Sequence, residues 1–140
     1  MCRAAEALAQ TRRTLPGWLD NYTFLGIVES VYRQEKAIIW LGDSLGVLRG
    51  FPASVRVALG SELRRLQIGE LPLDSKPTKT VGPGVRELRA KDRDKQYRTV
   101  YLLAKSDDVV VLHSFVKKTR RTSKKDIDIA KERFKYFKRT

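Results

Sequence analysis

The sequence contains very few residues of the kinds that form disulfides or bind metals. Among its 140 residues there is one cysteine, Cys2, and one histidine, His113. A single cysteine excludes an internal disulfide framework and is typical of a reducing compartment. One cysteine and one histidine far apart in the chain do not form a standard zinc site. No GxxxxGK segment followed by Ser or Thr is present, which excludes a P-loop nucleotide site.

Long apolar runs are also missing. No stretch approaches the roughly 18 consecutive apolar residues of a membrane span. The first residues, MCRAAEALAQTRRTLPGW, contain basic side chains but no apolar segment after them, so they do not resemble a secretory signal. Because 41% of the chain is hydrophobic, one core can form without disulfides or metals. We therefore predict a soluble, cytoplasmic domain with no cofactor and no membrane partner.

Positive charge is abundant and unevenly distributed. The chain has 29 Lys and Arg against 16 Asp and Glu, a net charge of +13. Residues 1–35 are neutral overall and residues 36–85 carry +3, whereas residues 86–140 carry 18 basic and 8 acidic groups, net +10. A field concentrated in this way attracts polyanions. The plainer alternative is a basic surface that only keeps the protein soluble.

The pattern of apolar residues predicts one α+β domain over residues 36–140, preceded by an extension over residues 1–35. We expect strands at 36–42, 85–89, 96–104 and 109–116, helices at 51–69 and from Ser123 onward, and a loop at 70–84. Asp43 or Ser44 is expected to cap a short helical turn after the first strand. The four-residue KSDD turn predicts antiparallel pairing of the last two strands.

Both long helices have clear signals. The helix at 51–69 begins near Pro52 and has one apolar stripe at helical spacing, formed by Val55, Leu59, Leu63 and Leu66. The last helix begins with Ser123 as N-cap and Asp126 three residues later, which resembles a capping box. Its apolar stripe comprises Ile127, Ala130, Phe134 and Phe137.

Cations lie on the strands as well as in the turns. Arg98 lies on the same strand face as Val100 and Leu102, where an apolar residue would be expected. Arg89 ends the strand before it, and Lys117 and Lys118 follow the last strand. If these strands are neighbours, their cations converge on one surface that can bind a phosphodiester and stabilise a pentavalent transition state. The alternative is that Arg98 extends from the sheet edge and that KKTRR is a solvated turn.

The single histidine and the aromatic residues near the C-terminus are further candidates for chemistry. His113 makes a Ser/His/Asp triad formally possible, but a lone histidine on an apolar strand is more typical of a packed core residue. The last helix carries many Lys and Arg residues, which is ordinary for an exposed face. Tyr136 and Phe137 have aromatic faces that can stack on bases, although Phe137 lies on the apolar stripe.

The order of these motifs resembles a known family. The run from Trp40 to Phe137 resembles the RelE/ParE toxin superfamily, and within it the HigB-like, phage-derived branch. The resemblance is carried by FPASVRVALGSELRRLQIGELP, GVRELR, QYRTVYLLA and VVVLHSFVKKTRRTSKKDIDIAKER, in this order. It covers about the last 100 residues and leaves 1–30 unexplained. Val31 is a candidate alternative start, which would make 1–30 an artefact of the assigned start codon.

The resemblance implies a small RelE-like α+β fold with an antiparallel-rich sheet, a helical segment after the first strand and a C-terminal helix. It also implies the toxin of a toxin–antitoxin pair, a metal-independent endoribonuclease that cleaves mRNA on the ribosome by attack of a 2′-OH on the adjacent phosphate. The implied partners are an antitoxin, expected to be a helix-turn-helix protein, the ribosome and mRNA, with no small-molecule substrate.

The same resemblance assigns residues to roles. Arg98 stands where the family has its key strand arginine, Lys118 matches the basic residue after the last strand, and Arg89 matches a basic position on the strand before Arg98. The RelE prototype has a tyrosine early in the last helix that this sequence lacks. Some HigB-type members use aromatic or histidine side chains near the C-terminus, which makes Tyr136 a candidate substitute. His113 matches a histidine common in this branch and is the other catalytic candidate, although the match itself says nothing about chemistry. The expected RNA-binding residues are Lys117, Arg120, Arg121, Lys124 and Lys125.

Two other functions stay open on the same fold. One is a ParE-like inhibitor of DNA gyrase, which binds rather than cleaves, and the other is a non-catalytic family member that binds RNA or protein. The fold alone does not separate them.

Overall fold

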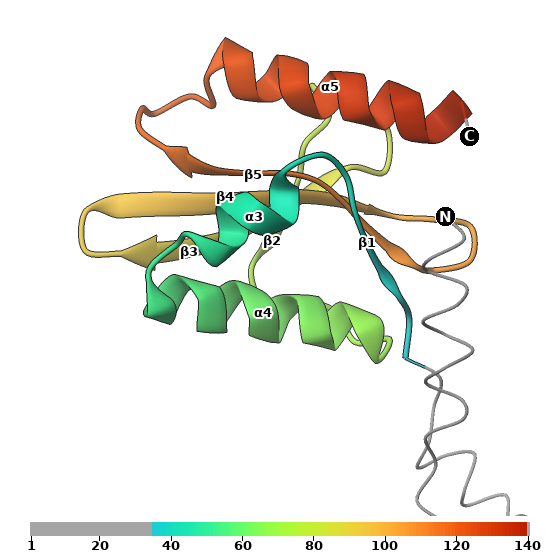
Figure 1. Ribbon diagram of the computed structural model, residues 1–140, viewed down its shortest axis with the longest axis horizontal. Helices are drawn as coiled ribbons and strands as arrows, with labels where there is room; N and C mark the ends of the chain where they lie inside the picture. Colours follow the sequence, from blue (N-terminus) through green and yellow to red (C-terminus); the bar gives the residue numbers. More distant parts are fainter. Residues whose placement is uncertain (1–34, 140) are drawn as a thin grey trace, which may run out of the picture.

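A computed structural model describes residues 35–139 of the chain (Figure 1). The expected extension over residues 1–35, apart from Glu35, and the alternative start at Val31 therefore lie outside the described residues. The elements, in chain order, are β1 (Ile38–Trp40), α3 (Ser44–Arg49), α4 (Ala53–Gln67), β2 (Ser75–Pro77), β3 (Arg86–Asp92), β4 (Lys95–Leu103), β5 (Val109–Lys117) and α5 (Lys124–Arg139).

The strands form one five-stranded sheet in the order β1-β5-β4-β3-β2. β1 pairs with β5 in parallel, and all other neighbours are antiparallel. Helix α4 covers one face of this sheet and α5 covers the other (Figure 1). The architecture confirms the predicted α+β class, with a helical segment after the first strand and a C-terminal helix, and it is that of a small RelE-like fold.

Most predicted elements are present, with altered bounds. The strand predicted at 36–42 is shortened to β1, and the one predicted at 85–89 extends to Asp92. The predicted loop at 70–84 is wrong in part, because Ser75–Pro77 pairs with β3 as β2. Pro52 is the N-cap of α4 rather than its first helical residue. Asp43 is the N-cap of α3, but its side chain makes no capping hydrogen bond.

Each face of the sheet buries its own apolar cluster. On the α4 side, the predicted stripe of α4 packs against Leu88, Tyr97, Tyr101 and the odd-numbered valines of early β5. On the α5 side, Ala130, Phe134 and Phe137 pack with Val100, Leu102, Val110, Leu112 and Phe115. The apolar run of β5 is explained by this arrangement, since a strand covered on both faces has no polar side.

A β-bulge divides β5 into two halves. Val100 pairs with His113 and Tyr101 pairs with Val111, so Leu112 is an extra residue with no partner in β4. An extra residue reverses which face each later side chain occupies. His113, Phe115 and Lys117 therefore lie on the α5 side of the sheet, the same side as their β4 partners Val100, Arg98 and Gln96.

Helix α5 begins as its sequence predicts. The backbone N–H of Asp126 donates to Ser123 Oγ at 3.2 Å, and Ser123 Oγ donates to Asp126 Oδ2 at 2.6 Å. Farther along, Arg133 donates to the carbonyl of Leu112 at 2.9 Å and to Asp43 Oδ1 at 2.7 Å. The helix is thus fixed to both β5 and the start of α3 by polar contacts as well as by its apolar stripe.

Candidate nucleic-acid interface

Cations from three strands and a linker gather at one end of the sheet. This is the end where β5 stops, where β3 turns into β4, and from which the chain crosses to α5 (Figure 1). A cleft of about 470 Å³ opens there, and we call it the cationic cleft. Its lining residues are Arg89, Asp94, Gln96, Arg98, Lys117, Lys118, Thr119 and Arg120. Five of these eight carry a positive charge and one a negative charge, so the cleft is strongly electropositive.

Strand register explains why these side chains meet. Arg89 of β3 lies directly opposite Arg98 of β4, and Gln96 of β4 lies directly opposite Lys117 of β5. Residues paired across a sheet share a face. The bulge at Leu112 is needed for this arrangement, because without it Lys117 would lie on the α4 side.

Arg98 is the deepest residue of the cleft and is only 2% exposed. Its Nη2 donates to Gln96 Oε1 at 2.6 Å and its Nη1 donates to the carbonyl of Tyr97 at 3.1 Å. Its Nε lies 3.6 Å from Glu87 Oε1 and has no hydrogen-bond partner. Burial lowers the pKa of Arg98, and Arg89 lowers it further, whereas the Glu87 carboxylate raises it. The sequence predicted a surface cation here, and the structure instead shows a buried one.

The other cations of the cleft are more accessible. Lys118 and Arg120 are exposed and Lys117 is half-buried, so these three reach solvent at the rim. Arg89 is half-buried and lies 3.8 Å from Asp74 Oδ1, while its Nε is buried without a hydrogen-bond partner. The cleft therefore has solvent-accessible charges at its rim and two more buried guanidinium groups inside.

His113 lies outside the cleft lining. It is 5% exposed, its Nε2 is 2.8 Å from Asp126 Oδ1, and its ring stacks on Phe115 at 5.3 Å. The Asp126 carboxylate lies between His113 and Ser123, since its other oxygen accepts from the serine. A nucleophilic serine would bond to the imidazole itself. In this structure the histidine anchors the start of α5 to the sheet.

Tyr136 is also outside the cleft lining. It is 63% exposed and lies near the C-terminal end of α5, twelve residues beyond Lys124. At 1.5 Å per residue, this places it about 18 Å along the helix axis from the end that adjoins the cleft.

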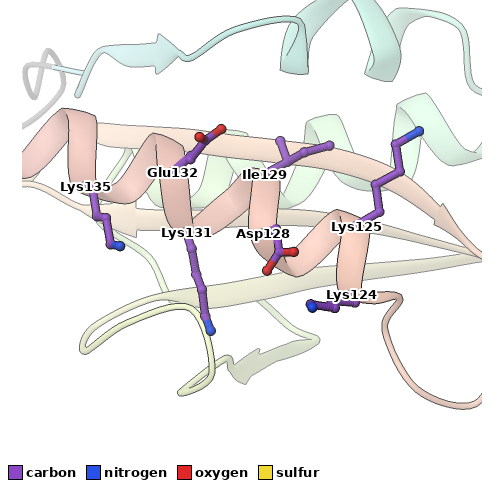
Figure 2. A pocket seen from close by; sticks show the side chains of 7 residues that line it. All are labelled: Lys124, Lys125, Asp128, Ile129, Lys131, Glu132 and Lys135. Carbon is purple, nitrogen blue, oxygen red and sulfur yellow. The ribbon is translucent and has the colours of Figure 1, made fainter.

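The remaining RNA-binding candidates divide between two surfaces. Arg121 is exposed in the linker between β5 and α5 and does not line the cleft. Lys124 and Lys125 belong to a shallow hollow on α5, which we call the α5 surface (Figure 2). Its lining residues are Lys124, Lys125, Asp128, Ile129, Lys131, Glu132 and Lys135. Lys124, Lys131 and Lys135 project from the same side of the helix, together with Asp128 (Figure 2).

Gln96, Asp94 and Thr119 are cleft residues that the sequence analysis did not single out. Gln96 carried a usable signal, because it stands two positions before Arg98 and alternation places both on one face. Asp94 and Thr119 lie in turns, where the sequence gives no such rule.

Residues 35–139 contain neither a metal-binding cluster nor a membrane-spanning helix. In this part of the chain, no three His, Cys, Asp or Glu side chains come together as a metal-binding group. Nor does this part contain a helix long and apolar enough to cross a membrane.

The fold and the cleft together define a small RelE-like α+β protein with a cationic cleft at one end of its sheet. The chain belongs to the family of phage-derived Gp49-like proteins (DUF891), which matches residues 47–135. This family is RelE-like and toxin-like, and the matched range includes every residue of the cationic cleft. No curated protein matches the chain.

Proposed function

We propose that this protein is the toxin of a toxin–antitoxin pair and that it cleaves mRNA on the ribosome without a metal. The observation that carries the proposal is the cationic cleft, where five cations lie within one hollow of about 470 Å³. Such a concentration of charge suits a phosphodiester, which is anionic at rest and gains further charge in the transition state.

The proposed reaction is an internal transfer at phosphorus. The 2′-oxygen of one nucleotide forms a bond to the adjacent phosphorus as its proton leaves. The bond from phosphorus to the 5′-oxygen of the next nucleotide breaks, and that oxygen takes up a proton. The products are a 2′,3′-cyclic phosphate and a 5′-hydroxyl end.

In this scheme Lys118 and Arg89 bind the phosphate from the rim and the side of the cleft, and Arg98 stabilises charge from inside. Lys117, Arg120 and Arg121 hold the RNA backbone on either side, and Lys124 and Lys125 extend this contact along α5 toward ribosomal RNA. Neither His113 nor Tyr136 lines the cleft, so we assign the catalytic effect mainly to positioning and charge. A more acidic antitoxin would neutralise the protein by covering the cleft.

The test is to map mRNA 5′ ends on ribosomes after inducing the protein in cells. Wild type should produce codon-phased 5′-hydroxyl ends. Lys118→Ala should abolish most of them, and Arg98→Lys should reduce them while preserving charge. The matched control is Lys105→Ala, which removes an exposed lysine from the turn between β4 and β5, at the other end of the sheet. It should cleave like wild type.

Two results would contradict the proposal. Growth arrest with intact mRNA and blocked DNA supercoiling would favour the gyrase-binding alternative. Equal cleavage by Lys118→Ala and Lys105→Ala would show that the cationic cleft is not where RNA binds.

A further inference from the structure

On one side of the Arg98 guanidinium, only one of the two nitrogen donors makes a hydrogen bond. Its Nε and Nη2 groups point their N–H bonds the same way, and this pair is the one that grips two oxygens of a phosphate or carboxylate. Nη2 donates to the neutral Oε1 of Gln96 at 2.6 Å. Nε has no acceptor, because Glu87 Oε1 is 3.6 Å away. This pair of donors therefore binds one neutral oxygen, although its geometry suits two oxygens of an anion.

Gln96 is well placed to give up this contact. It is exposed at the start of β4 and lines the cationic cleft beside Arg98. Rotation of its amide into solvent would uncover Nη2, while the carbonyl of Tyr97 still holds Nη1 from the other side. Arg98 would then keep its position and face the cleft.

When a phosphate is present, replacement of the Gln96 amide by a phosphate oxygen at Nη2 is favourable. A hydrogen bond from a guanidinium to an anionic oxygen is roughly twice as strong as one to a neutral oxygen. In addition, a phosphate can accept a hydrogen bond from Nε, which at present has only its ion pair with Glu87 at 3.6 Å. Without a phosphate, the Gln96 amide satisfies a donor that would otherwise be buried and unpaired.

We propose that Gln96 occupies the Nη2 donor of Arg98 in the free protein and yields it to a phosphate oxygen of bound RNA. Gln96 thereby sets how tightly the cleft holds a phosphodiester. This inference rests on the proposed function, since it takes RNA as the natural ligand. It makes Gln96 a positioning residue rather than a catalytic one.

Two substitutions at one position should shift affinity in opposite directions. Gln96→Ala removes the competing acceptor and should tighten binding of a short single-stranded RNA about fivefold. Gln96→Glu places a carboxylate against the guanidinium and should weaken binding about tenfold or more. Thr80→Glu is the matched control, because it adds the same charge at an exposed position outside the cleft, in the loop between β2 and β3. Its binding should fall less than that of Gln96→Glu.

The assay is fluorescence anisotropy on the full chain, with thermal unfolding to verify that all variants are folded. RNA binding by Gln96→Ala that equals or falls below wild type overturns the inference and leaves the proposed function standing. If wild type binds no short RNA in solution, the proposed function is still decided by the cleavage test on ribosomes. The inference is then decided with inorganic phosphate, by following the Arg98 Nε–H signal in NMR spectra. That signal should respond at lower phosphate concentration in Gln96→Ala than in wild type, and an identical response would refute the role of Gln96.

Discussion

Replacing Lys118 by methionine should reduce the salt dependence of RNA binding by the contribution of about one phosphate contact. Three cations reach solvent at the rim of the cleft, namely Lys117, Lys118 and Arg120. For single strands, the logarithm of affinity falls with the logarithm of salt concentration by about 0.7 per phosphate neutralised. Three contacts give a slope of about −2, or about a 20-fold loss between roughly 50 and 200 mM salt. With Lys118→Met, the slope should become about −1.4 and the loss about 7-fold.

The same measurement separates the two cationic surfaces. If Lys124, Lys131 and Lys135 of the α5 surface also bind the strand, six contacts give a slope near −4 and a loss of about 300-fold. A short RNA that spans only the cleft should therefore show the smaller slope, and a longer one the larger slope.

The assay is anisotropy of a labelled 2′-O-methyl RNA, which keeps every phosphate but has no free 2′-OH, so cleavage cannot occur. Lys105→Met serves as the control because it removes the same charge at the other end of the sheet. Equal slopes for the Lys118 and Lys105 variants, or an affinity that does not change with salt, would refute the assignment of the cleft as the phosphate-binding surface.

Two further predictions concern the attachment of α5. Gly42 has φ +56° and a Cβ there would clash with the Arg133 guanidinium, whereas Gly69 has φ +83° and open space. In urea denaturation, both alanine variants should lose about 1–2 kcal/mol of unfolding free energy from backbone strain. Only Gly42→Ala should lose about 1–2 kcal/mol more, because its Cβ meets Arg133. In an Arg133→Ala background this extra loss should disappear. Arg133 also holds the pKa of Asp43 below its usual range through a hydrogen bond. A carboxyl whose pKa is lowered by folding stabilises the fold at pH values above its unfolded-state pKa of about 3.9, and this stabilisation is lost as pH falls through the folded-state pKa. Asp43→Asn should therefore be less stable than wild type at pH 7 and equal to it in strong acid, as measured by urea denaturation at the two pH values.

Local sequence signals predicted most of this fold. The stripes of the two long helices, the Ser123 cap and the short turn before β5 depend on neighbours within a few residues, and all are present. β2 was missed because SKP has no strand pattern of its own, and only its pairing with Arg86, Glu87 and Leu88 makes it a strand. The bulge at Leu112 was also missed. It lies in a continuous apolar run, where apolar and polar residues do not alternate and a change of face therefore leaves no signal in the sequence.

The sequence predicted which cations form the candidate site, but not that Arg98 is buried. Alternation along β4 and proximity of three strands were enough to bring Arg89, Arg98 and Lys118 together. The contact of Arg98 with Gln96 follows from alternation along β4, but its approach to Glu87 depends on the pairing of β3 with β4, which spacing does not reveal. His113 was ambiguous for the same reason, because its partner Asp126 comes from the next element of the chain.

The bulge at Leu112 links the pairing of the last two strands to the formation of the cationic cleft. The hairpin of β4 and β5 closes through a short turn and can form early, since it requires little loop closure. The bulged register places Lys117 on the same face of the sheet as Gln96 and Arg98. In a hairpin shifted by one residue, Lys117 would lie on the opposite face, away from Arg89 and Arg98. Chains with mispaired strands would therefore also lack the complete cationic cleft, which forms only with the native pairing.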